Sequence, residues 1–187
     1  MKLYVIRHGE SETNKTKCWT GWMDARLTEQ GIEDAGVAGK LLQGISFDRV
    51  YASDLTRAMD TAKNALPGCT PTPERLLREI HVGNLSGTPI ENVPVADRIR
   101  MAVDGFVAYE GESQDQFHDR IRAFLRQVEK IECENIAAFS HGGWLRGALE
   151  EVVGISLRGA RISCDNCTVA IFEYTNNTWR LHSWINP

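Results

Sequence analysis

The sequence predicts an α/β protein: a three-layer α-β-α sandwich built on a mostly parallel mixed sheet. Two observations support this class. Short apolar runs of strand length recur along the chain, and each of the first three is followed by a stretch with helical signals, as β-α units require. The expected strands cover residues 2–7, 49–53, 135–140, 168–174 and 178–184. The 187 residues fit one domain, 1–187, with a short cap-like insertion at about 80–112.

Two helices and one turn are expected between these strands. The clearest helix covers 113–132, where apolar residues recur at spacings of three and four: Phe117, Ile121, Phe124, Leu125 and Val128. Ser113 and Gln116 form a capping box at its start. A second helix should run from Thr28 to about Leu42, with Ile32, Ala35 and Leu42 facing inward, although three glycines weaken it. Asn176-Asn177 suits a hairpin turn between the last two strands.

Composition sets bounds on function. The chain is 42% hydrophobic and 25% charged, with a formal net charge of -4, which is ordinary for a soluble globular protein and gives no reason to expect a nucleic-acid surface. The apolar stretch at 3–6 is too short for a signal peptide core or a membrane span, so we expect a cytoplasmic protein without a membrane partner. A homodimer is compatible with the sequence.

The cysteines argue against a disulfide framework, because there are five of them, scattered along the chain. Cys164 and Cys167 have the spacing of half a zinc site, but no second pair stands where a metal would need it. We expect two thiols that flank a turn before a strand.

Two expected strands end in a histidine followed by glycine. The first gives Arg7-His8-Gly9 and the other gives Ser140-His141-Gly142. The carboxyl ends of strands in open α/β sheets open onto the crevice where ligands bind. The two imidazoles are therefore expected in one ligand-binding crevice.

Arginines near these histidines indicate that the ligand is a phosphoryl group. A guanidinium is well shaped for bidentate phosphate contacts, and Arg7 and Arg57 are the candidates. Arg57 follows the strand end at Ser53 and falls in the first turn of the next helix, where free amides also favour an anion. Surrounding cations should lower the pKa of His8 from about 6.5, which leaves a neutral nucleophile able to form a phosphoenzyme. His141 would donate a hydrogen bond to the transferring group.

The Arg7-His8-Gly9 triplet with a distant His141-Gly142 resembles the histidine phosphatase superfamily, which includes cofactor-dependent phosphoglycerate mutases and many phosphomonoesterases. The resemblance extends from Met1 to about Gly154 and implies the phosphoglycerate mutase-like fold. It implies that His8 is the phosphorylated nucleophile, that Glu79 is the proton donor and that the remaining site residues bind phosphate or substrate: Arg7, Arg57, His141, Asn14, Thr20, Gly21 and Gly142. No metal or organic cofactor is implied.

Departures from the mutase pattern point to the compact phosphatase branch of that superfamily. Mutases carry tyrosine where this chain has Val82, and asparagine where it has Gly143. They also hold a sugar carboxylate with an adjacent arginine pair, for which Arg98 and Arg100 are the nearest substitute. We therefore expect a phosphomonoesterase acting on a small phosphorylated metabolite. A phosphoglycerate mutase stays an alternative, because the stretch 18–25 is mutase-like, and so does a non-catalytic phosphate sensor.

The remaining expectations concern the segment 80–112 and the unassigned histidines. That segment should cap the site and set specificity. Trp19, Trp22, Met101 and Tyr109 are candidates to line the mouth of the site, and we expect at least half of them to serve packing instead. Neither a His-Glu-x-x-His nor a paired Asp motif occurs, which argues against metal-dependent hydrolysis. The other histidines are expected to be structural: His81, His118 and His182.

Overall fold

The computed structural model describes residues 1–156 and 162–187. Within them, six strands form one sheet in the order β3-β2-β4-β1-β5-β6. The strands are β1 (Lys2–Arg7), β2 (Arg49–Ala52), β3 (Thr72–Pro73), β4 (Asn135–Ser140), β5 (Val169–Thr175) and β6 (Thr178–Ile185). Strands β3, β2, β4 and β1 are mutually parallel, whereas β5 runs antiparallel to both of its neighbours. The predicted mostly parallel mixed sheet is confirmed.

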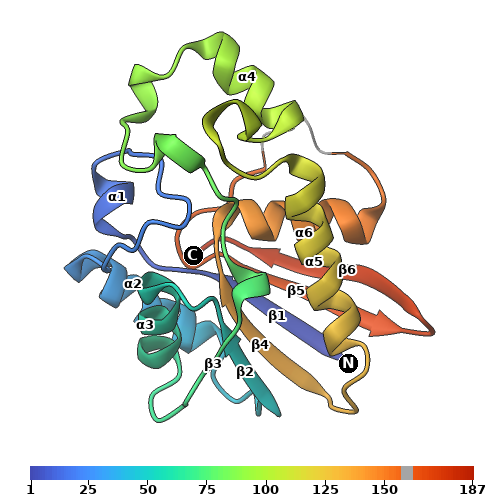
Figure 1. Cartoon of the computed structure of the whole chain (residues 1–187). Helices are drawn as coiled ribbons and strands as arrows, with labels where there is room; N and C mark the ends of the chain where they lie inside the picture. The colour runs from blue at the N-terminus through green and yellow to red at the C-terminus, as the bar shows by residue number, and fades with distance from the viewer. Residues whose placement is uncertain (157–161) are drawn as a thin grey trace.

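Helices cover both faces of this sheet, so the predicted three layers are present. The pair α2 (Glu29–Leu41) and α3 (Thr56–Ala65) lies on one face, and α5 (Gln114–Val128) and α6 (Gly142–Val153) lie on the other (Figure 1). A short helix, α1 (Glu12–Lys15), follows β1, and α4 (Val95–Asp104) stands apart from the sheet at the top of Figure 1. No helix of the described part is long and apolar enough to cross a membrane.

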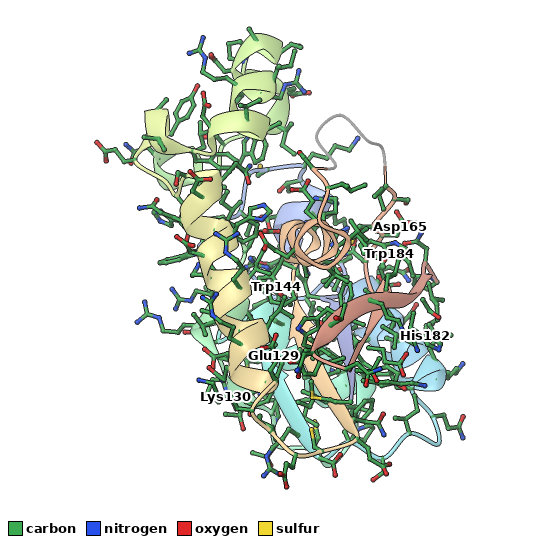
Figure 2. The ribbon with its side chains drawn as sticks, turned by 90° about the vertical axis from the view of Figure 1, so that its right-hand side faces the viewer. Glu129, Lys130, Trp144, Asp165, His182 and Trp184 are labelled. Atoms are coloured by element: carbon green, nitrogen blue, oxygen red, sulfur yellow. The ribbon has the colours of Figure 1, made fainter. Side chains whose placement is uncertain are left out.

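The two faces of the sheet have separate apolar cores. Alternate residues of β1 point to opposite faces: Leu3 and Val5 join the core under α5 and α6, and Tyr4 and Ile6 join the core under α2 and α3. Trp144 of α6, labelled in Figure 2, is fully buried, and its ring meets that of Phe124 of α5 edge-on at 5.7 Å. Because both faces are covered, the strands read as nearly continuous apolar runs.

Helix α5 forms as predicted, whereas the inward face of α2 was predicted wrongly at one position. Ser113 and Gln116 make the capping box, and the five apolar positions of α5 are buried. Helix α2 begins after its N-cap Thr28, but Ile32 is 48% exposed. The inner face of α2 carries the small residues Gly31, Ala35 and Ala38 instead. A Cβ at Gly39 would lie 2.5 Å from the carbonyl oxygen of Ala65 in α3, so this interface is too close for large side chains.

A second close contact joins α2 to the loop that follows His8. A Cβ at Gly9 would lie 2.2 Å from the carbonyl oxygen of Gly31, and a Cβ at Gly31 would lie 2.0 Å from the carbonyl oxygen of Glu10. Both positions need glycine because the two backbones occupy the space that a side chain would need.

The expected cap-like segment, 80–112, holds α4 and three short 3-10 turns, Gly83–Leu85, Ile90–Asn92 and Val107–Tyr109. Helix α4 buries Met101 on its inner face and exposes Val95, Ile99 and Val103 on its outer face. That the segment caps the site stays a prediction. The cysteines are free thiols, and Cys167, at a positive φ of 61°, lies in the turn before β5 as expected.

Candidate active site

The two strand-end histidines are neighbours because β1 and β4 are adjacent and parallel. Arg7 is in register with Ser140, so His8 and His141 both follow directly beyond the strands. The backbone amide of His8 donates to the carbonyl of Ser140 at 2.9 Å, and the two imidazole centroids lie 5.1 Å apart. The predicted juxtaposition of the two rings is therefore present in the fold.

His8 is oriented for attack through Nε2. Its Nδ1 lies 2.7 Å from the carbonyl oxygen of Gly9, and because a carbonyl can only accept, Nδ1 carries the proton and Nε2 keeps its lone pair. Burial lowers the pKa of His8 well below its ordinary value, and the positive charges of Arg57 and Arg7 lower it further. The predicted direction of the pKa shift agrees with this geometry, although burial rather than charge is the larger cause. His8 is therefore neutral at pH 7.

Arg57 lies in the first turn of α3 and is 1% exposed. Its two terminal nitrogens donate to the carbonyls of Gly21, at 2.8 Å, and Met23, at 3.0 Å. Burial lowers its pKa to about 10, so the guanidinium stays charged at pH 7. The loop 20–23 thus sets the orientation of this arginine, a role that the sequence did not indicate.

Arg7 and Gly142 lie against each other. A terminal nitrogen of Arg7 donates to the carbonyl of Cys164, and a Cβ at Gly142 would lie 3.3 Å from Arg7 Nε. Burial lowers the pKa of Arg7, while the carboxylate of Glu79 opposes that change. The small residue at 142 leaves room for the guanidinium between the two strand ends.

His141 is fully buried and is held by a residue to which the sequence gave no role. Its Nε2 lies 2.9 Å from the hydroxyl oxygen of Ser53, at the end of β2. Burial and the charge of Arg57 lower the pKa of His141 well below its ordinary value. Ser53 follows a strand that was predicted, so its place at the strand end is the only signal that the sequence offered.

Five buried side-chain nitrogens lack a hydrogen-bond partner among the described residues, and three of them belong to neighbours of His8: Arg7 Nε, Arg57 Nε and His141 Nδ1. Buried polar groups are nearly always hydrogen-bonded, so such a group needs an explanation. All three residues lie beside His8, and the two guanidiniums are positively charged. An anionic ligand rich in acceptor oxygens suits this arrangement, and a phosphoryl group is such a ligand.

Asn14 and Thr20 are brought to the same site by the loop after β1. Asn14 completes a capping box with Ser11, and its side-chain oxygen also accepts from Asn166 at 3.3 Å. The hydroxyl of Thr20 donates to that of Thr13 at 2.8 Å. Sequence reasoning missed Thr13 and Asn166, which hold these two side chains in place.

The carboxylate of Glu79 is fixed by two backbone amides. Oε1 accepts from the amide of Ile80 at 3.0 Å, and Oε2 accepts from the amide of Gly143, in the first turn of α6, at 2.9 Å. A Cβ at Gly143 would lie only 2.2 Å from Oε1. The residue that departs from the mutase pattern is thus the residue that makes room for the carboxylate.

One cavity of about 460 Å³ contains these predicted groups: Arg7, His8, Asn14, Thr20, Gly21, Arg57, Glu79 and Gly142. Within the described residues the lining does not include His141, whose ring lies 5.1 Å from that of His8. The rest of the lining comes from α4, α5, α6 and nearby loops and mixes apolar with polar and charged side chains. The apolar ones are Trp19, Ile80, Val82, Met101, Phe106, Phe117 and Ile162, and the polar and charged ones include Arg98, Gln114, His118, Arg146 and Glu150.

Two of the four candidates for the mouth of the cavity line it, which agrees with the expectation that at least half of them serve packing. Trp19 and Met101 line the cavity, whereas the lining within the described residues does not include Trp22 or Tyr109. Trp22 instead packs against His81, with ring centroids 4.7 Å apart and the rings tilted by 57°. His118, expected to be structural, lines the cavity, and its Nδ1 lies 2.6 Å from a carboxylate oxygen of Glu151.

Arg98 and Arg100 do not act as a pair. Arg98 lines the cavity, whereas Arg100 is exposed and lies 3.8 Å from Asp97 on the surface. Residues two apart on a helix face different directions, so the spacing itself rules out a shared site. His182 is exposed on the edge strand β6 (Figure 2). The described residues contain no cluster of three or more side chains able to hold a metal ion.

The neutral, oriented His8 lies beside the guanidiniums of Arg7 and Arg57 and shares a cavity with the fixed carboxylate of Glu79, which are the kinds of groups that phosphoryl transfer requires. A model of the histidine phosphatase superfamily (branch 1) matches residues 3–187, and the chain belongs to this superfamily. Probable phosphoglycerate mutase GpmB of Photorhabdus laumondii is 28% identical over 194 residues, which cover 99% of this chain and 90% of that protein.

Solved structures with the same fold are also known. YhfR of Bacillus stearothermophilus has a TM-score of 0.85 and 25% identity, and the match covers 97% of this chain and 95% of YhfR. The mycobacterial glucosyl-3-phosphoglycerate phosphatase has a TM-score of 0.87 and 24% identity, with 98% of each chain covered. These similarities confirm the predicted phosphoglycerate mutase-like fold.

Proposed function

We propose that this chain is a phosphomonoesterase that hydrolyses a small phosphorylated metabolite through a phosphohistidine at His8. The observation that carries the proposal is the pairing of a neutral His8, whose Nε2 is free to attack, with unpartnered guanidinium nitrogens on the adjacent Arg7 and Arg57. The guanidiniums would bind the equatorial oxygens and stabilise the charge of the transferring group. The rest of the cavity, which has both apolar and charged side chains, would receive the alcohol part of the ester.

The reaction then has two steps. In the first, the lone pair of Nε2 forms a bond to phosphorus, the bond from phosphorus to the ester oxygen breaks, and Glu79 gives its proton to that oxygen. In the second, Glu79 takes a proton from water, the water oxygen bonds to phosphorus, and the P–N bond breaks to release inorganic phosphate and restore His8. One carboxyl group serves as acid and then as base. Neither step calls for a metal ion or an organic cofactor.

A phosphoglycerate mutase is the second candidate, and the name of the Photorhabdus relative favours it. The departure at Gly143 supports the phosphatase. A Cβ there would lie 2.2 Å from Glu79 Oε1, so the carboxylate would have to shift to accommodate the asparagine of the mutase pattern. A sensor that only binds phosphate would not need both His8 and Glu79 beside the same cavity.

The test is a screen of phosphorylated metabolites with and without 2,3-bisphosphoglycerate. Release of free phosphate, with an acid-labile phosphoenzyme that disappears in His8→Ala, is the expected result. Isomerised phosphoglycerate without free phosphate would establish the mutase instead, and binding without turnover would establish the sensor. Undiminished activity in His8→Ala, or loss of wild-type activity in EDTA, would overturn the mechanism.

A further inference from the structure

Arg120 of α5 has its hydrogen-bonding capacity fully used by protein groups. Its Nε and one terminal nitrogen hold both carboxylate oxygens of Glu112, at 2.7 and 2.8 Å. The terminal nitrogens also donate to the carbonyls of Leu76, Arg78 and Glu79, each at 3.0 Å. A guanidinium has five N–H donors, and five bonds are made. As far as the chain is described, the cavity lining does not include Arg120, so this residue touches protein rather than substrate.

The carbonyls that Arg120 binds belong to the segment that carries the proposed proton donor. The carbonyl of Glu79 accepts a second hydrogen bond, from Trp22 Nε1 at 2.7 Å. The indole of Trp22 in turn lies under the guanidiniums of Arg78, at 4.8 Å, and Arg120, at 5.8 Å. The backbone of Glu79 is therefore fixed on its outer side by Arg120 and Trp22, and its carboxylate is fixed on the inner side by Gly143.

Glu112, the other partner of Arg120, connects the two ends of the segment 80–112. Glu112 Oε2 accepts from the backbone amide of His81 at 2.8 Å, and the amide of Glu112 donates to the carbonyl of His81 at 2.8 Å. Two hydrogen bonds thus connect Glu112, at the end of the segment, to His81, near its start. Arg120 binds both Glu112 and Glu79 and so connects this pair to the proposed acid.

We propose that Arg120 is a positioning residue that acts through Glu79, by holding the acid's backbone at a fixed distance from the cavity. The proposal rests on the proposed function, in which Glu79 protonates the leaving oxygen. Proton transfer requires hydrogen-bond distance, and a displacement of about 1 Å can reduce a rate by about 100-fold. Among the described residues, no hydrogen bond joins His8 to this segment, so attack by His8 should be less affected. Loss of Arg120 should therefore slow esters with poor leaving groups selectively.

The test compares two aryl esters, phenyl phosphate, whose leaving oxygen needs the acid, and 4-nitrophenyl phosphate, whose leaving oxygen hardly needs it. In Arg120→Lys, which keeps the charge but loses the planar fork, kcat/KM should fall about 100-fold for phenyl phosphate and less than about fivefold for 4-nitrophenyl phosphate. Arg122→Lys is the control, because Arg122 lies on the same helix, pairs with Asp119 and Glu151, and should change neither ester. Equal losses for both esters in Arg120→Lys, or no loss, would overturn the proposal.

A double-mutant cycle separates positioning from a general structural effect. If Arg120 acts through Glu79, then adding Arg120→Lys to Glu79→Gln should change hydrolysis of phenyl phosphate by less than about threefold, whereas independent effects would multiply. Thermal unfolding shows whether Arg120→Lys has lost its fold. If it has, Glu112→Gln replaces it, because this variant weakens the same contacts with little change of shape. The loss of kcat/KM is then again compared between phenyl phosphate and 4-nitrophenyl phosphate. Glu79→Gln alone tests the acid: if it lowers kcat/KM, which reports the first step, equally for both esters, the proposed role of Glu79 as the acid fails together with that of Arg120. If Glu79→Gln slows phenyl phosphate selectively but Arg120→Lys does not, the proposed function stands and the inference about Arg120 fails.

Discussion

The backbone amide of Gly143 donates a hydrogen bond to Glu79 Oε2 at 2.9 Å, so the first turn of α6 holds the proposed acid beside the histidine pair. The amides of a first helical turn have no partner within the helix, and the positive end of the helix dipole favours a carboxylate. The same turn follows directly from His141. One strand-to-helix junction therefore carries both His141 and the amide that orients the proposed acid.

Gly143→Ala should impair the acid without removing it. The new Cβ would lie 2.2 Å from Glu79 Oε1, so the carboxylate must move, and kcat/KM for phenyl phosphate should fall by about 10- to 100-fold. Gly36→Ala is the matched control, because a Cβ at Gly36 on α2 meets nothing within 4 Å and should leave the rate unchanged. Steady-state kinetics of the two variants is the measurement, and wild-type activity in Gly143→Ala would refute the role assigned to this glycine.

The lowered pKa values of His8 and His141 predict a loss of stability in mild acid. Both rings stay neutral in the folded protein below pH 6.5, while in the unfolded chain they take up a proton near about 6.5. The unfolded state then binds more protons, so the free energy of unfolding should fall as the pH drops below about 6.5, by up to about 1.4 kcal/mol per pH unit for each histidine. No such loss from these groups is expected above about pH 7.

Denaturant unfolding between pH 7.5 and 5 measures this effect. The double variant His8→Gln, His141→Gln should show a shallower decline than the wild type, since its two side chains do not titrate. His182→Gln serves as the control because His182 is exposed, and its slope should match that of the wild type. Identical slopes for all three proteins would contradict the buried, neutral state of the two histidines.

Ser53→Ala should weaken phosphoryl transfer through His141. The substitution removes the hydroxyl that lies 2.9 Å from His141 Nε2, leaving this nitrogen without the partner that orients the ring. A loss of about 1–3 kcal/mol is typical when a buried polar group is left unpaired, and we expect kcat to fall about tenfold. Ser86→Ala, in an exposed turn, is the control. The measurements are kcat and inhibition by orthovanadate, and unchanged values for both would show that Ser53 does not support His141.

The ends of the strands were the part of the site that the sequence predicted best. Strand periodicity located His8 and His141, and the parallel pairing of β1 with β4 placed them side by side. Arg57 followed from the same reasoning, because a helix must begin after β2. Glu79 lies after a 3-10 turn, Arg75–Leu77, with no periodicity, so only the family resemblance identified it.

Contacts between distant segments were not predictable from local patterns. Ser53 and His141 are 88 positions apart, and Arg120 reaches Glu79 across 41 positions. The exposure of Ile32 also depends on a contact between distant segments. The spacing of Ile32 fitted the inward face of α2, but α2 lies so close to α3 that this face has room only for small residues. Which of the four candidates for the mouth would pack elsewhere was also not predictable, and Trp22 proved to donate to the carbonyl of Glu79.

The contact between Gly9 and Gly31 makes the nucleophile depend on a helix that contributes no residue to the cavity lining within the described part of the chain. A methyl group at either position would push α2 away from the loop that follows His8, and the imidazole would move with that loop. Random mutagenesis selected for activity should therefore find positions 9 and 31 as intolerant as the catalytic residues. Position 36, on the open side of the same helix, should accept almost any side chain that supports a helix.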